Sequence, residues 1–131
     1  LFPSSKVRYI YKVEDESRKL MIDRSQMEQV LINLLKNAGE ACMDQPNPEV
    51  VVETDYQAEN HIFRLSVTDN GCGILPEVVD RIFIPFFTTK PTGSGIGLSL
   101  CKQIMTLHGG SIRVKSELGK GSCFTLKLVG K

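Results

Sequence analysis

The chain has 131 residues, of which 41% are hydrophobic; this is enough to bury one core but too little for two full domains. Sixteen basic residues against fifteen acidic ones give a formal net charge of +1, which argues against a protein that binds nucleic acid by neutralising many phosphates. No apolar run reaches the roughly 18 residues of a membrane span, and four irregularly spaced cysteines fit reduced thiols, so we expect a cytoplasmic domain without direct membrane contact.

The first part of the chain predicts one strand followed by a long helix. Residues 7–13 alternate in polarity, which indicates a strand with one face better buried than the other. Asp23 and Gln26 form a capping-box pattern that marks the start of a helix. Apolar residues then recur at helical spacing, at Met27, Val30, Leu31, Leu34, Leu35, Ala38 and Cys42. This pattern predicts the main core helix.

The rest of the chain alternates between strands and helices. Four β-rich runs predict two hairpins, and they cover residues 50–56, 62–69, 112–117 and 123–129. Between the hairpins we expect a short helix over 77–83, after Pro76, and a longer one over 97–108 that ends at Gly109 and Gly110. The fold class is therefore an α/β (α+β) two-layer sandwich, with a mixed, mostly antiparallel sheet of about five strands packed on about three helices.

Three groups of residues suggest chemistry, and the first lies on the core helix. Asn33, Asn37 and Glu40 share one stripe at the border of the apolar face. An asparagine inside a helix needs partners for its amide. The stripe therefore indicates either a ligand or hydrogen bonds to neighbouring backbone, and by itself it does not choose between them.

The second group is the Asp-Asn-Gly-Cys-Gly segment. Asp69 ends a strand, and Gly71 and Gly73 follow without side chains that would keep a flat ligand from the backbone. A carboxylate at this place can accept a hydrogen bond from an exocyclic amine. The alternative is a plain hairpin, because Asp-Asn-Gly favours turns, but the residues after Gly73 do not begin a returning strand.

The third group runs from Phe83 to Leu98. It contains three phenylalanines around Pro85, then Thr88-Thr89-Lys90, and then the glycine-rich run Gly93–Leu98. Such a run lets successive amides point inward and leads into a helix N-terminus, where a phosphate is favoured. It fits neither a Walker A nor a Rossmann pattern, and a mobile surface loop is the alternative.

Together, these motifs resemble the N, G1, F and G2 boxes of sensor histidine kinases. They are Asn33–Ala38, Asp69-x-Gly71-x-Gly73, Arg81–Lys90 and Gly93-x-Gly95-x-Gly97-Leu98. The resemblance covers nearly the whole chain and implies the Bergerat ATP-binding fold of the GHKL superfamily, in the short-lid type of nitrogen- and oxygen-responsive bacterial sensors. Residues 1–131 are accordingly expected to form one catalytic ATP-binding domain. The phosphoacceptor, dimerisation and sensor domains are expected outside this sequence, in a parent protein that could be membrane-anchored.

By this resemblance, Asp69 would hold the adenine amine, Asn37 would ligate Mg²⁺ through its side-chain oxygen, and Lys90 would face the terminal phosphates of ATP. Asn33, Asn37 and Lys90 are the implied catalytic residues. Ser122 stands in a segment similar to the family's late Gly-x-Gly-Thr element. The implied nucleotide-binding residues are Asn33, Asn37, Asp69, Gly71, Gly73, Ile74, Phe83, Thr88, Thr89, Lys90, Gly93, Ser94, Gly95, Ile96, Gly97, Leu98 and Ser122.

The resemblance also implies a reaction. ATP-hydrolysing relatives carry a glutamate four residues before Asn37, whereas this chain has Asn33, which cannot act as a base; this favours phosphoryl transfer over hydrolysis. The implied acceptor is a histidine on the dimerisation domain, and through it a response regulator. The isolated domain is expected to be monomeric and not to phosphorylate itself. An anti-sigma-factor type serine kinase, a non-catalytic ATP-binding regulatory module and a structural domain with a vestigial pocket are the open alternatives.

Overall fold

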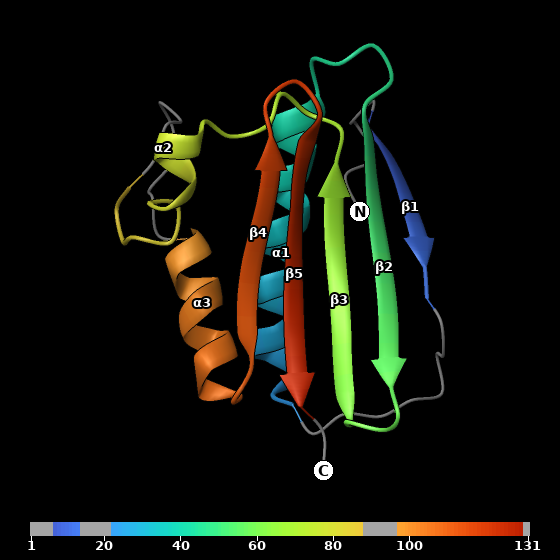
Figure 1. Ribbon diagram of the computed structural model, residues 1–131, viewed down its shortest axis with the longest axis vertical. Coiled ribbons are helices and arrows are strands. Elements are labelled where there is room, and N and C mark those ends of the chain that lie inside the picture. The colour runs from blue at the N-terminus through green and yellow to red at the C-terminus, as the bar shows by residue number, and fades with distance from the viewer. Residues whose placement is uncertain (1–6, 14–21, 88–96, 130–131) are drawn as a thin grey trace.

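A computed structural model describes residues 7–13, 22–87 and 97–129. In this part of the chain, one five-stranded sheet packs against helices (Figure 1). The elements in chain order are β1 (Arg8–Lys12), α1 (Arg24–Cys42), β2 (Glu49–Gln57), β3 (Ile62–Asp69), α2 (Pro76–Val79), α3 (Gly97–Leu107), β4 (Ser111–Glu117) and β5 (Gly121–Val129).

The sheet has the strand order β1-β2-β3-β5-β4. β1 runs parallel to β2, and the three other pairs are antiparallel. Figure 1 shows α1 crossing behind the sheet, with α3 alongside it next to β4. The predicted two-layer sandwich, with its mixed and mostly antiparallel sheet, is confirmed.

The start of α1 is held by two partners. The side chain of Asp23 accepts a hydrogen bond of 2.9 Å from the backbone N–H of Gln26, as the capping-box pattern predicted. The backbone N–H of Asp23 in turn donates to Nε2 of His108, at 3.0 Å. Because Nε2 accepts, the proton of this ring lies on Nδ1, which donates to the carbonyl of Ile104 at 2.8 Å. A neutral His108 therefore ties the end of α3 to the start of α1.

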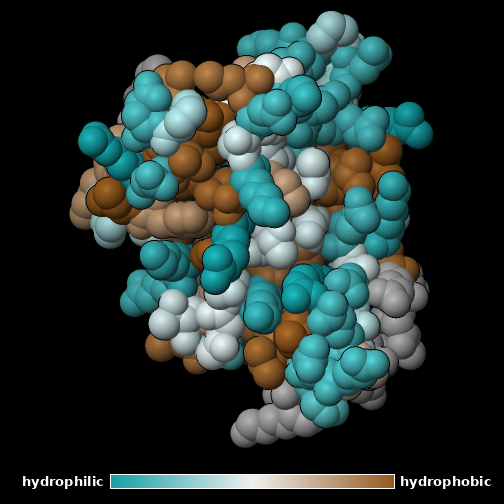
Figure 2. All heavy atoms as spheres, viewed as in Figure 1, coloured by the Kyte–Doolittle hydropathy of each residue, from teal (hydrophilic) through white to brown (hydrophobic). Residues whose placement is uncertain are grey.

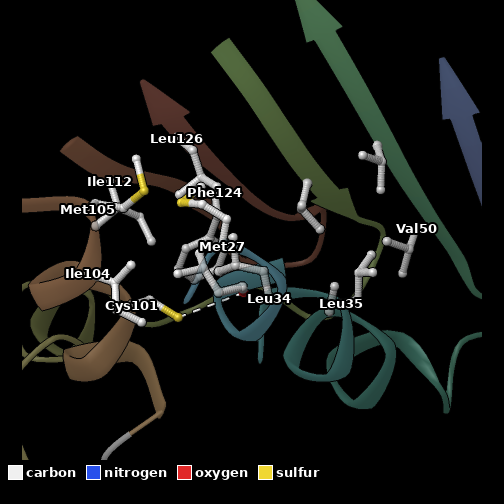
Figure 3. Packing of buried hydrophobic residues seen from close by; sticks show 14 of the residues in the cluster. Met27, Leu34, Leu35, Val50, Cys101, Ile104, Met105, Ile112, Phe124 and Leu126 are labelled. Carbon is white, nitrogen blue, oxygen red and sulfur yellow. Dashed lines mark hydrogen bonds between the residues drawn. The ribbon is translucent and has the colours of Figure 1, made fainter. Parts of the chain in front are cut away.

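The core lies between the sheet and the two longer helices. Figure 3 shows side chains from α1 and α3 meeting those of β4 and β5. Leu34 and Val30 from α1, Met105 from α3 and Val67 from β3 are almost completely buried. Cys101 lies among them, with its thiol 3.8 Å from the carbonyl of Val30. The apolar stripe of α1 is therefore the contact surface on which both α3 and the sheet pack, as its spacing predicted.

The second predicted helix is shorter than expected. The sequence predicted a helix over 77–83, but α2 covers only Pro76–Val79. The chain then continues in turns, with the N–H of Arg81 donating to the carbonyl of Val78 at 2.8 Å. The helix does not extend to Phe83 because five of the six residues from Val78 to Phe83 have low intrinsic helix propensity. Further along, Phe86 adopts a positive φ of 67°.

The sheet face turned away from α1 is polar. Figure 2 shows mainly hydrophilic and neutral side chains over this face, with scattered hydrophobic ones between them. Ser66 and Thr125 lie with their hydroxyl oxygens 3.4 Å apart, and Arg64 pairs with Asp55 at 3.6 Å. An antiparallel sheet with one polar face can leave that face in water. Within residues 7–13, 22–87 and 97–129, no helix has the length and apolar content needed to cross a bilayer.

The packing of α1 gives the first prediction. Leu34 is 1% exposed, so Leu34→Ala should lower the free energy of unfolding by about 2–5 kcal/mol, because it removes buried apolar contacts and leaves a cavity. Ile32 lies two residues earlier and is 52% exposed, so Ile32→Ala should cost less than about 0.5 kcal/mol. Urea denaturation followed by circular dichroism measures both changes; equal losses would contradict this account of the core.

Candidate functional site

The centre of the candidate site is the carboxylate of Asp69, at the end of β3. Its side chain is buried, and Oδ1 accepts a hydrogen bond of 2.9 Å from the backbone N–H of Gly71. Burial raises the pKa of Asp69 above its ordinary value, and hydrogen bonds from the backbone amides of Gly71 and Ser122 partly oppose that rise. A buried carboxylate at a strand end is a hydrogen-bond acceptor that water does not compete for.

Three glycines let backbone segments pack closely at this end of the sheet. A Cβ on Gly71 would clash with the carbonyl of Ala41 and would lie 2.9 Å from Oδ1 of Asp69. A Cβ on Gly121 would clash with the carbonyl of Asp69, and Gly73 has a φ of +79°, which side chains rarely adopt. Of the two glycines that the sequence predicted for the site, Gly71 lies against Asp69, and Gly73 lies against the backbone of Glu117 at the end of β4.

Two serines join the loop after Asp69 to the last hairpin. Ser122 lies opposite Asp69 in the register of β3 and β5, and it is buried. The hydroxyl of Ser116, on β4, accepts a hydrogen bond of 2.7 Å from the N–H of Ile74. The two hydroxyl oxygens, of Ser116 and Ser122, are 2.8 Å apart. Ile74 and Ser122 were predicted site residues; the structure places Ser122 opposite Asp69 and joins Ile74 to Ser122 through Ser116.

Sequence reasoning missed Ser116, and it also missed the role of Asn70. The side chain of Asn70 accepts from the N–H of Glu49 at 2.9 Å and donates to the carbonyl of Asn47 at 2.7 Å. It therefore clamps the loop before β2 to the end of β3. The alternating pattern of β4 could have identified Ser116. This serine follows Ile112 and Val114 on the core-facing side of the strand, where a polar side chain needs a hydrogen-bond partner.

Asn33 and Asn37 are half-buried on α1, and Glu40 is exposed. Oδ1 of Asn33 would lie 3.3 Å from a Cβ on Gly97, the first residue of α3. Burial raises the pKa of the Cys101 thiol to about 11, and a hydrogen bond with the side chain of Asn33 partly opposes that rise. Asn33 therefore faces the first turn of α3, as expected if the glycine-rich run leads toward this stripe.

α1 connects the two groups of predicted residues. Gly71 packs against Ala41 near the end of α1, and Gly97 packs against Asn33, eight residues earlier. At 1.5 Å per residue, these contacts are about 12 Å apart along the helix, and Asn37 lies midway between them. A ligand that touched both groups would therefore be extended along α1.

Phe83 contributes to the core beside the site. Its ring makes an edge-to-face contact with Phe124 at 6.3 Å between centroids, and Nζ of Lys102 lies 5.8 Å from its centroid. Leu98 also packs against the core. Of the predicted nucleotide-binding residues, Thr88, Thr89, Lys90, Gly93, Ser94, Gly95 and Ile96 lie outside the described residues.

The described residues offer oxygen ligands for a metal rather than a dense ligand cluster. No group of three or more histidine, cysteine or acidic side chains comes together in this part of the chain. The side-chain oxygen of Asn37 is the kind of ligand that Mg²⁺ prefers, and Mg²⁺ commonly takes one or two protein ligands and keeps several waters. The residues present thus fit Mg²⁺ bound together with a phosphate ligand better than a closed structural metal site.

Comparison with known proteins decides the family. The family model described as "Histidine kinase-, DNA gyrase B-, and HSP90-like ATPase" matches residues 22–130. The chain belongs to this family. Its members are described as ATPases, and the match includes all three groups of predicted residues. The resemblance found in the sequence motifs and the predicted fold class are both confirmed.

Relatives within the ATPase family are histidine kinases. The signal transduction histidine-protein kinase AtoS of Escherichia coli is 39% identical over 95% of this chain and 20% of its own length. The catalytic domain of histidine kinase ThkA, solved without nucleotide, is 32% identical, with a TM-score of 0.85 over 98% of this chain and 82% of that one. A complex of ThkA with response regulator protein TrrA has a TM-score of 0.80, 29% identity and coverage of 99% of this chain and 36% of that one. The chain spans about a fifth of the length of the curated relatives it matches, between 16% and 26%.

The burial of Asp69 gives a prediction for stability. Because burial raises the pKa of Asp69 in the folded chain, the folded state holds this proton more tightly than the unfolded state does. Protonated Asp69 therefore adds its full contribution to the free energy of unfolding at a pH below its pKa in the unfolded chain. This contribution is lost as the pH rises through the pKa of Asp69 in the folded chain. Asp69→Asn keeps an oxygen for Gly71 and removes the titration. We expect this variant to lose less stability than the wild type between acid and neutral pH, and to be at least as stable at neutral pH.

Urea unfolding at a series of pH values tests this, with the exposed Asp44→Asn as the matched control. The control should follow the wild-type curve. An Asp69→Asn chain that is less stable than the wild type at neutral pH would show that the amide donors outweigh desolvation, contrary to the expectation.

Proposed function

We propose that the chain is a histidine kinase catalytic domain, which binds Mg-ATP and donates the γ-phosphoryl group to a histidine on a dimerisation domain, in two-component signal transduction. The observation that carries this proposal is the arrangement along α1. A buried carboxylate, Asp69, lies at one end, and Asn33 faces the start of α3 about 12 Å away, with Asn37 between them. Membership of an ATPase family with histidine kinase relatives supports it.

The proposed base site is at Asp69. An ionised carboxylate only accepts hydrogen bonds, so it favours a base that presents an N–H donor, such as the exocyclic amine of adenine. A base with a carbonyl at that position would bring an acceptor against an acceptor, and a buried mismatch of this kind is costly. Gly71 keeps the loop backbone close to this position.

The proposed phosphate site is near the middle of α1, where Asn33 faces the start of α3. Asn37 would hold Mg²⁺, which when bound supplies charge neutralisation for the β- and γ-phosphates. Gly97 starts an 11-residue helix, whose N-terminal amides favour an anion. Lys90 and the run from Gly93 to Ile96 are proposed to complete this site from outside the described residues.

The proposed acceptor lies on another domain. Both nitrogens of His108 are engaged, with Asp23 and Ile104, and Nδ1 of His61 lies 3.3 Å from the hydroxyl of Tyr56. These contacts give the two histidines structural roles.

Asn33 offers no base for activating water, which favours phosphoryl transfer over hydrolysis. The complex of ThkA with TrrA supports a response regulator as the downstream partner. A monomeric, cytoplasmic domain belongs to the same proposal.

The binding site is tested by calorimetry with Mg-ATP. We expect Asp69→Asn to weaken binding by roughly 10- to 100-fold, because a hydrogen bond to a charged acceptor is replaced by a mismatched amide. Asn37→Ala should weaken binding of Mg-ATP but leave binding of adenosine unchanged, since it acts at the metal. The exposed Asp44→Asn serves as the control. Equal affinities for the wild type, Asp69→Asn and Asn37→Ala would refute the assignment.

The reaction is tested by adding γ-labelled ATP and a cognate dimerisation domain to the purified chain. We expect acid-labile label on the dimerisation domain and none on the chain itself. Acid-stable label would indicate a serine kinase instead. Intact ATP binding without label on either protein would indicate a regulatory module, and stable label on the chain alone would contradict a separate acceptor.

A further inference from the structure

The hydroxyl of Ser116 lies between three neighbours, and their chemistry fixes its proton. Its oxygen is 2.7 Å from the N–H of Ile74, 3.1 Å from the carbonyl of Gly121 and 2.8 Å from the hydroxyl of Ser122. The N–H can only donate, so Ser116 accepts from Ile74. The carbonyl can only accept, so Ser116 donates its single proton to Gly121.

This assignment also fixes the proton of Ser122. Ser116 has no second proton to give, so the 2.8 Å contact between the two hydroxyls requires Ser122 to be the donor. Ser122 has then used its only proton on Ser116, and it retains only lone pairs for any other partner. The hydroxyl of Ser122 is thereby converted from a group that can donate or accept into one that only accepts.

The site around Ser122 already contains another acceptor. Asp69 and Ser122 are opposite each other on neighbouring strands, where Cβ atoms lie about 4.5–5.5 Å apart. Both side chains are buried, at 4% and 6% exposure, and both belong to the sheet face that carries the core. A ligand edge that reaches this pair meets acceptors from both strands.

We propose that Ser116 is a positioning residue that sets base specificity by orienting the proton of Ser122. The inference rests on the proposed function and deepens it. With Ser116 in place, Asp69 and Ser122 both require donors, offered directly by an amino group or through a water. A 6-amino purine meets this requirement, whereas a 6-oxo purine brings a carbonyl oxygen to the same place. Without the Ser116 hydroxyl, Ser122 can rotate and donate to that carbonyl.

The test compares Mg-ATP with Mg-ITP, which carries a 6-oxo purine in place of the 6-amino purine. The readout is the ratio of the two dissociation constants, measured by calorimetry on the 131-residue chain. For the wild type we expect ITP to bind at least about tenfold more weakly than ATP. Ser116→Ala should reduce this ratio at least about threefold, and Ser116→Thr, which keeps a hydroxyl, should preserve it.

Ser111→Ala is the matched control. Ser111 is a half-buried serine at the opposite end of the same strand, and its removal should leave the ratio unchanged. The effect of Ser116→Ala should also vanish in a Ser122→Ala background, because Ser116 acts through Ser122. Circular dichroism checks the fold of each variant. If Ser116→Ala does not fold, Ser116→Cys replaces it, since a thiol is a much weaker donor and acceptor.

The outcomes separate this inference from the proposed function. A wild-type chain that binds neither nucleotide refutes the function itself. A chain that binds ATP but does not discriminate against ITP overturns the inference alone. Three results for the ratio of the ITP and ATP dissociation constants would also overturn the inference. The ratio could stay unchanged in Ser116→Ala, or it could fall as much in Ser116→Thr as in Ser116→Ala. It could also fall further when Ser116→Ala is added to Ser122→Ala.

Discussion

The structure of the candidate site depends on one constraint, the burial of the Asp69 carboxylate at the end of β3. Burying a charged group is unfavourable unless polar groups surround it, and here backbone amides of Gly71 and Ser122 supply donors. Those amides can approach only because Gly71 and Gly121 lack side chains. The loop that follows β3 packs against α1, where Gly71 meets the carbonyl of Ala41. A carboxylate held in this way keeps its acceptor capacity for a ligand, at some cost in stability near neutral pH.

α1 both packs the core and carries residues of the candidate site, and these two sets of residues lie on different parts of its surface. Leu34 and Val30 bury one face and join the sheet to α3, while Asn33 and Asn37 line the border of that face. The distance between the base end and the phosphate end of the proposed site is therefore set by the rigid rise of a helix. The neutral imidazole of His108, bonded to the start of α1, fixes α3 relative to this helix. The core and the site consequently share one element, so a change in the packing of α1 also changes the geometry of the site.

Much of the fold follows from local patterns. The capping box at Asp23 and the apolar spacing after it predicted α1, and the two hairpins and the glycine stop at residue 109 were also predicted. These signals succeed because each depends on residues within a few positions of one another. The helix expected over 77–83 was too long because the apolar pattern there is not matched by helix propensity. Five of the six residues from Val78 to Phe83 are weak helix formers, and α2 ends at Val79.

The local sequence predicted which chemical groups the site offers: a carboxylate followed by glycines, two asparagines one turn apart and a glycine-rich run before a helix. These could be predicted because each motif is continuous in the chain. The partners of these groups follow from the packing of distant segments. Ser116 meets Ile74 across 42 residues, Asn70 meets Glu49 across 21, and His108 meets Asp23 across 85. A single hydroxyl or amide carries no local signal of the strand that it will face, because strand pairing and helix packing choose its neighbour, and with it the direction of its proton.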